Sequence, residues 1–156
     1  MANVADIVAR HGAVRENLLL MLHDLQDSTP GKFLRSEDLR EVAAALGLPV
    51  SEVKGTASFY SMFSFQPRGE HIIRVCDSPP CFVLGSELVL NAVREKLGIE
   101  VGETSEDGMF TLETSSCLGL CGVAPAMMID DEAYGNLTPE RIGRILDTLA
   151  ATEAVS

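Results

Sequence analysis

Two short segments decide the fold of this chain: VCDSPPC at residues 75–81 and SCLGLCGVAPA at residues 116–126. They contain all the cysteines of the chain, in two close pairs: Cys76 with Cys81, and Cys117 with Cys121. The 35 residues between the pairs (82–116) have the pattern of a small α/β unit. Each pair can supply two sulfurs from a single segment, so four sulfurs can converge on one centre. The spacing therefore predicts one four-thiolate metal site.

The spacing alone leaves several kinds of site open. A [2Fe–2S] cluster takes four thiolates, and plant-type ferredoxins use a CxxxxC element, whereas zinc also binds four thiolates, commonly from CxxC knuckles. Disulfides and free thiols are further alternatives, although a thioredoxin-style dithiol uses CxxC, which this sequence lacks. The residues around the second pair favour iron–sulfur, because small and apolar residues exclude water and let backbone N–H groups approach the sulfurs. They are Leu118, Gly119, Leu120, Gly122 and Val123.

Composition bounds the class of protein. The chain has 156 residues, of which 46% are apolar, enough for one ordinary domain or two small ones. Its formal charge of −11 predicts no nucleic-acid partner, because such partners need a basic surface. No run of 18 apolar residues exists, so we expect no direct membrane insertion. The first six residues lack the features of a targeting signal, and we expect a cytoplasmic protein, free or in the peripheral arm of a membrane-associated complex.

Residues 1–68 are predicted to form a helical N-terminal domain. Apolar residues at helical spacing form a stripe that ends at residues 28–31, where Pro and Gly stop the helix. The stripe consists of Val14, Leu18, Met21, Leu22 and Leu25. Ser36 is expected to cap a second helix. Core packing is expected for Phe59, Tyr60 and Phe63. Residues 66–69, QPRG, form the natural domain boundary.

Residues 69–156 are predicted to form the second domain. His71–Cys76 is a β-branched strand that ends on the first cysteine, and a loop with two prolines follows it. Ser86–Leu97 is a helix that ends at Gly98. The remaining elements are a strand at Met109–Glu113, a strand at Ala126–Ile129 and a helix that Thr138 caps. The order β, α, β, β, α predicts an α/β (α+β) fold in which a helical segment precedes a thioredoxin-like domain.

Five segments together resemble one known family in order and spacing. They are TASFYSMF (56–63), VCDSPPC (75–81), KLGIEVGET (96–104), SCLGLCGVAPA (116–126) and YGNLTPE (134–140). The resemblance is to the thioredoxin-like [2Fe–2S] ferredoxin subunit of NADH-oxidising complexes. This family includes the 24 kDa-type (E) subunit of NADH:quinone oxidoreductase and its relatives in NAD-dependent formate dehydrogenases and electron-bifurcating [FeFe]-hydrogenases. The similarity covers nearly the whole chain.

The resemblance implies one [2Fe–2S] cluster, held by Cys76, Cys81, Cys117 and Cys121. It implies a non-catalytic electron-transfer subunit that exchanges single electrons with the FMN of a partner NADH-binding subunit, in first place in an NADH:quinone oxidoreductase-type complex. FMN and NAD(H) are then expected on the partner, with further iron–sulfur subunits beside it. This chain itself has no GxGxxG fingerprint and no P-loop. The alternatives are the equivalent hydrogenase or formate dehydrogenase subunit, a free-standing thioredoxin-like ferredoxin, and a zinc-stabilised interaction module.

Overall fold

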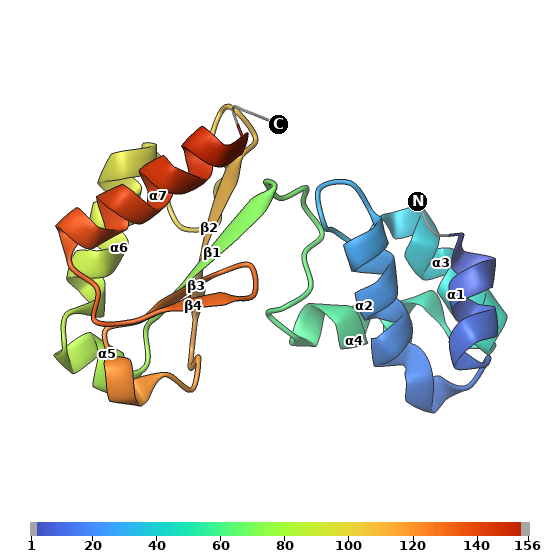
Figure 1. Cartoon of the computed structure of the whole chain (residues 1–156). Coiled ribbons are helices and arrows are strands. Elements are labelled where there is room, and N and C mark those ends of the chain that lie inside the picture. The colour runs from blue at the N-terminus through green and yellow to red at the C-terminus, as the bar shows by residue number, and fades with distance from the viewer. Residues whose placement is uncertain (1–2, 154–156) are drawn as a thin grey trace. The chain divides into compact units, whose positions relative to one another are not determined.

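Helices alone build the first part of the chain, and helices with a mixed sheet build the second (Figure 1). The computed structural model describes residues 3–153. The ends of the two predicted domains, residues 1–2 and 154–156, lie outside this range. The chain divides into two compact units, Met1–Arg68 and Gly69–Ser156, which we call the helical unit and the sheet unit. The predicted α+β fold class is confirmed, and the independence of the two units as domains stays a prediction.

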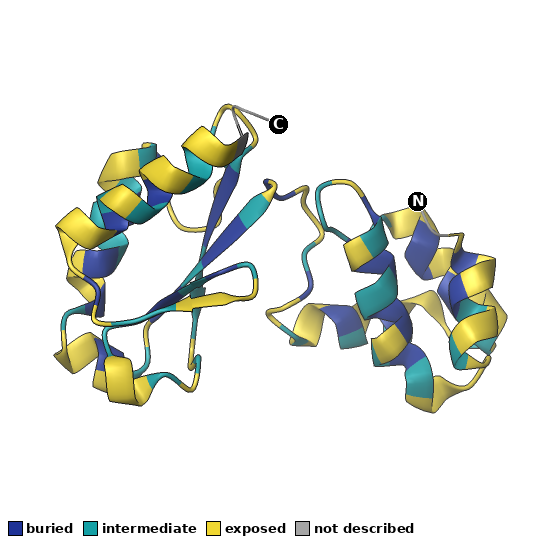
Figure 2. Ribbon diagram, in the orientation of Figure 1, coloured by how far each residue is buried: buried dark blue, intermediate teal, exposed yellow. Residues whose placement is uncertain are grey.

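The helical unit has one apolar core. Its elements are α1 (Val4–His11), a 3₁₀ turn (Arg15–Asn17), α2 (Leu18–Ser28), α3 (Ser36–Leu46) and α4 (Val50–Phe59). Apolar residues at helical spacing meet in the core, where Ile7, Met21 and Leu22 have no exposed surface (Figure 2). Four residues of the predicted stripe are buried, but Val14 is 47% exposed because the 3₁₀ turn separates it from α2. Phe59 is 80% exposed, so its assignment to the core is wrong.

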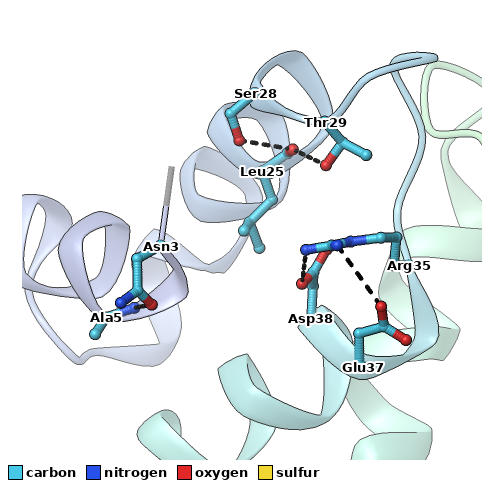
Figure 3. A network of polar contacts seen from close by, with 8 residues as sticks. All are labelled: Asn3, Ala5, Leu25, Ser28, Thr29, Arg35, Glu37 and Asp38. Atoms are coloured by element: carbon cyan, nitrogen blue, oxygen red, sulfur yellow. Dashed lines mark hydrogen bonds and ion pairs between the residues drawn. The ribbon is translucent and has the colours of Figure 1, made fainter. Parts of the chain in front are cut away.

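Polar contacts satisfy backbone groups at the ends of α1 and α2 (Figure 3). The side chain of Asn3 accepts a hydrogen bond from the N–H of Ala5 (3.1 Å) at the start of α1. At the end of α2, the hydroxyls of Ser28 and Thr29 donate to the carbonyl of Leu25, at 3.0 and 2.8 Å. Backbone groups at the ends of a helix lack the usual backbone partner four residues away, so these side chains take the place of the missing backbone bonds.

The start of α3 differs from the prediction. Arg35, not Ser36, is the N-cap residue, and no side chain caps the helix. The guanidinium of Arg35 donates two hydrogen bonds of 2.8 Å to the carboxylate of Asp38, and an ion pair of 3.7 Å joins it to Glu37 (Figure 3). Two carboxylates in the first turn of a helix are favourable, because the N-terminal end carries partial positive charge. The carboxylates of Glu37 and Asp38, and not the hydroxyl of Ser36, therefore stabilise the start of α3.

Asp24 on α2 joins the end of α1 to α2. Its carboxylate lies 2.8 Å from Nε2 of His11 and accepts a hydrogen bond of 2.7 Å from Arg10. The hydrogen bond with His11 and the positive charges of both partners lower the pKa of Asp24 below its ordinary value. Such a carboxyl stabilises the fold at pH above the unfolded-state pKa of about 4, and this contribution is lost as the pH falls through the lower folded-state pKa.

We expect Asp24→Asn to lower the free energy of unfolding at pH 7, and the difference from the unaltered chain to shrink as the pH falls below about 4. Urea unfolding of both proteins at pH 7 and pH 3 measures this. Asp27→Asn is the matched control, because Asp27 is exposed on the same helix. If the two variants responded to acid in the same way, the link between Asp24 and α1 would be wrong.

The sheet unit has a four-stranded mixed sheet in the order β2-β1-β3-β4. Its elements are β1 (His71–Cys76), α5 (Pro79–Val83), α6 (Ser86–Leu97), β2 (Phe110–Ser115), a 3₁₀ turn η2 (Cys121–Val123), β3 (Met127–Ile129), β4 (Glu132–Tyr134) and α7 (Pro139–Glu153). Strands β1 and β2 are parallel, and β3 is antiparallel to both β1 and β4. The crossover from β1 to β2 contains α5 and α6, as parallel neighbours require.

Helices α6 and α7 cover one face of this sheet (Figure 1). The side chains of Ile73, Leu112 and Met127 on the strands, and of Val93 and Ile142 on the helices, have no exposed surface. Alternate residues of a strand point to the same face of the sheet, so even these short strands contribute apolar side chains to this core. No helix among residues 3–153 has both the length and the apolar character needed to cross a membrane.

Two elements of the sheet unit were not predicted, and two predicted strands have other bounds: β2 is Phe110–Ser115 and not Met109–Glu113, and β3 is Met127–Ile129 and not Ala126–Ile129. Residues 79–83 form α5, where a loop was predicted. Proline fits the first positions of a helix, because the N–H that it lacks would have no partner there. Strand β4 was not predicted at all, since it has only three residues and is defined by its pairing with β3. The predicted bounds of β1 and α6 are confirmed.

Candidate metal centre

The first two predicted ligands lie in the interior. Cys76 is the last residue of β1, and its N–H donates to the carbonyl of Ala126 at 3.1 Å. Cys81 lies on α5. The two cysteines are only 2% and 1% exposed, and with Ala126 they form a small apolar cluster. Partly buried side chains of Leu118, Leu120 and Ala124 pack against this cluster.

The other two predicted ligands, Cys117 and Cys121, are exposed thiols on the segment that joins β2 to β3. The N–H of Gly119 donates to Sγ of Cys117 at 3.4 Å. Gly119 has a φ of +75°, a left-handed conformation that glycine adopts without steric cost. The turn therefore places a backbone donor against a thiol, as the sequence predicted for this segment.

Cys81 is the point where the two cysteine segments approach each other. Burial raises the pKa of the Cys81 thiol, as do its hydrogen bond with Cys76 and the neighbouring charges of Cys76 and Cys121. The segment that contains Cys121 packs against the apolar cluster around Cys81 through Leu118, Leu120 and Ala124, although 39 residues (82–120) separate Cys81 from Cys121 in the sequence. All four cysteines are free thiols. Across residues 3–153, however, no three Cys, His, Asp or Glu side chains converge closely enough to hold a metal ion as they stand.

The donors and their surroundings fit a [2Fe–2S] cluster. Four free thiols match the four thiolates that such a cluster needs. Residues 114–129 contain no charged residue and no histidine, so no carboxylate or imidazole competes from that segment. The buried pair supplies an apolar wall, and the exposed pair lies beside it on a segment with a backbone donor.

The turn that contains Cys121 is fastened to the segment after β4. The N–H of Asn136 donates to the carbonyl of Val123 at 2.6 Å. A Cβ atom at Gly135 would lie 2.5 Å from Cβ and 2.7 Å from the carbonyl oxygen of Val123, so only glycine fits there. The segment at residues 134–140 includes Gly135 and Asn136, but the sequence gave no indication that they contact Val123.

The comparison with protein families decides among the metal alternatives. The model of one family, described as "Thioredoxin-like [2Fe-2S] ferredoxin", matches residues 4–150 of this chain. The chain belongs to this family. Members of the thioredoxin-like [2Fe–2S] ferredoxin family are described by the cluster they contain, so the predicted cofactor is confirmed over the zinc alternative. The assignment of the four individual ligands stays a prediction.

Two curated relatives belong to different complexes. Over 106 residues the chain is 46% identical to the E subunit of NADH-quinone oxidoreductase from Pseudomonas aeruginosa, a match that covers 68% of this chain and 64% of that protein. Over 130 residues it is 38% identical to the HndA subunit of the NADP-reducing hydrogenase from Solidesulfovibrio fructosivorans. This match covers 83% of this chain and 75% of that protein. This ferredoxin-family chain thus spans slightly less than two thirds of the length of its quinone oxidoreductase relative.

A solved structure shares the fold. The NAD⁺-reducing [NiFe]-hydrogenase in its air-oxidised state contains a chain that superposes with a TM-score of 0.75 at 26% identity. The superposition covers 87% of this chain and 23% of the hydrogenase chain. The fold therefore occurs inside a larger polypeptide of a nicotinamide-linked enzyme.

Proposed function

We propose that this chain is an electron-transfer subunit that contains one [2Fe–2S] cluster and exchanges single electrons with the FMN of a partner NADH-binding subunit. The family match over residues 4–150 carries the proposal. The proposed ligands are Cys76, Cys81, Cys117 and Cys121, which are all free thiols. The cytoplasm is the proposed location, with further iron–sulfur subunits in the same complex.

The proposed ligands lie on two sides of the site, one buried and one exposed, and each side has a different role. When bound, a [2Fe–2S] cluster accepts and donates one electron at a time. Cys76 and Cys81 hold it from the buried side, where apolar neighbours exclude water. On the exposed side, the N–H of Gly119 offsets negative charge on the sulfur of Cys117. Such donors and the degree of burial are the means by which a protein tunes the potential of its cluster.

The parent complex that we propose is of the NADH:quinone oxidoreductase type, because relatives from such complexes are 44–46% identical to this chain. A specific observation favours a second candidate, the equivalent subunit of a nicotinamide-linked hydrogenase. The hydrogenase relative HndA is 38% identical over 83% of the chain, and the NAD⁺-reducing [NiFe]-hydrogenase shares the fold over 87% of it. Identity favours the first candidate, and coverage does not separate the two, because an E subunit of NADH-quinone oxidoreductase matches 89% of the chain.

Anaerobic reduction by NADH tests the proposed function. The chain is mixed with the FMN- and NADH-binding subunit of the same organism, NADH is added, and the EPR signal of a reduced [2Fe–2S] centre is recorded. We expect this signal with the partner and none without it, because the chain has no nucleotide-binding motif of its own. Reduction by NADH without the partner, or no reduction in its presence, would contradict the proposal.

Asp77 places a negative charge next to the first ligand. It is exposed, directly follows Cys76, and its N–H donates to the carbonyl of Ser115 at 3.0 Å. We expect Asp77→Asn to raise the midpoint potential of the cluster by roughly 10–50 mV, the range that Coulomb's law gives for one exposed charge near a redox centre. Reduction makes the centre more negative, so removal of a nearby negative charge favours it.

A redox titration monitored by EPR measures this shift. Glu106→Gln is the control, since Glu106 is an exposed carboxylate beyond the far end of α6 and salt screens it from the site. An unchanged or lowered midpoint in Asp77→Asn would refute the prediction.

A further inference from the structure

Exposed apolar side chains gather beside the first pair of cysteines. Phe82 and Val83 on α5 are 60% and 80% exposed, Leu84 after it is 58% exposed, and Leu88 in the first turn of α6 is 66% exposed. Four large apolar side chains thus face solvent within seven residues, at the point where α5 passes into α6 (Figure 2). We call these four residues the α5 patch. Exposed apolar groups that adjoin one another indicate a binding surface, whereas single ones do not.

Backbone contacts hold the α5 patch together. The N–H of Gly85 donates to the carbonyl of Phe82 (3.1 Å), and the N–H of Leu88 donates to the carbonyl of Gly85 (3.0 Å). Gly85 has a φ of +98°, so the chain turns sharply between the two helices. This turn keeps the start of α6 close to the end of α5, so the four exposed side chains belong to one compact segment of the chain.

The α5 patch lies on the outer side of the helix that supplies a buried ligand. Cys81 is 1% exposed, whereas its neighbour Phe82 is 60% exposed. One short helix therefore presents a proposed cluster ligand to the interior and two residues of the patch, Phe82 and Val83, to solvent. In Figure 1, α5 lies at the same end of the sheet as the orange segment that contains Cys121. A protein that covers the patch would come within about one helix diameter, roughly 10 Å, of the cluster site.

Charge indicates which kind of protein covers this patch. The sheet unit has five Lys and Arg against 15 Asp and Glu, a formal charge of −10, whereas the helical unit has seven against eight. Between Arg74 and Arg94 the chain has no basic residue, and its charged residues there, Asp77 and Glu87, are acidic and exposed. A second copy would bring two units of like charge together, which opposes self-association. The complementary partner is a surface with an apolar centre and a basic rim.

We propose that the α5 patch is the docking surface for the flavin-binding partner subunit, an inference that rests on the proposed function. Electron exchange requires the donor to approach the cluster closely, and this patch is an exposed apolar surface that begins directly after Cys81. The partner contributes apolar side chains at the centre of the contact and Lys or Arg opposite Asp77 and Glu87. Interfaces of this kind are apolar at the centre and polar at the rim.

Two single substitutions test the docking surface. Val83→Asp and Leu88→Asp each place a charge at the centre of the α5 patch, where it would lose water without gaining a partner. Leu88→Asp is the safer variant for folding, because a carboxylate is favourable in the first turn of α6. The matched control is Val101→Asp, which adds the same charge at a 44% exposed valine beyond the far end of α6. Visible absorption of the loaded chain shows whether each variant retains its cluster.

The measurement is the equilibrium dissociation constant between the loaded chain and the purified FMN- and NADH-binding subunit. We expect the dissociation constant to rise at least about tenfold for Val83→Asp and Leu88→Asp, and less than about twofold for Val101→Asp. Equal binding by all three variants would overturn the docking surface and leave the proposed function intact. No binding by the unaltered chain would overturn both. A dimer of the unaltered chain that Val83→Asp dissociates would assign the patch to a second copy instead.

Discussion

Replacement of Cys121 by Ala is expected to abolish the iron–sulfur cluster. The proposed site depends on all four thiolates, and the loss of one would remove a large part of the metal-binding free energy. Cys121 is an exposed free thiol at the start of a 3₁₀ turn, so the folded chain should persist without its sulfur. We expect the iron content and the visible absorption to fall below about one tenth of those of the unaltered chain.

Iron analysis and absorption spectroscopy of anaerobically purified protein measure this loss. Ser116→Ala is the control, since Ser116 is exposed on the same segment, directly before Cys117. It should retain the full iron content. Normal absorption and a normal EPR signal in Cys121→Ala would remove Cys121 from the set of ligands.

Replacement of Gly135 by Ala is the second change with a large expected effect. The added methyl group would overlap the side chain and the carbonyl of Val123, and Val123 ends the 3₁₀ turn that Cys121 begins. Overpacking of this kind costs about 1–3 kcal/mol of stability. Relief of the clash must move the turn, so we expect lower cluster occupancy as well as a lower free energy of unfolding.

Gly122→Ala separates this effect from a general sensitivity of the turn to substitution. Gly122 lies in the same turn, but a Cβ there would meet no atom within 4 Å. Urea unfolding and iron analysis should therefore give values for Gly122→Ala close to those of the unaltered chain. If Gly135→Ala were as stable and as fully loaded as Gly122→Ala, the contact between Gly135 and Val123 would not position the site.

Local sequence patterns predicted the regular elements that strong local signals define. Strand β1 is a β-branched run, and α6 ends at Gly98, which adopts the left-handed conformation with a φ of +67°. Prolines 79 and 80 misled the prediction, because proline both breaks helices and starts them, and only the structure shows that α5 starts there. Strand β4 has no local signal, since its three residues are strand only through pairing with β3.

The candidate site was predictable in its chemistry but not in its shape. Cysteine spacing predicted a four-thiolate centre, and the four free thiols lie on two segments that pack together around Cys76 and Cys81, while the assignment of the four ligands stays a prediction. The difference between the buried pair and the exposed pair depends on how α5 packs against Ala126. The contact of Gly135 with Val123 joins residues that are adjacent only after folding. The spacing of residues along the chain contains no information about the burial of each cysteine pair or about the contact of Gly135 with Val123.

Elemental analysis tests the central claim most directly. The claim is that this chain uses its cysteines to hold one binuclear iron–sulfur cluster. Anaerobically purified protein should contain about two iron atoms and two inorganic sulfide ions per chain, and the same sample should give the EPR signal of a [2Fe–2S] centre after reduction. Protein purified in this way that contains zinc, or neither iron nor sulfide, would contradict the account.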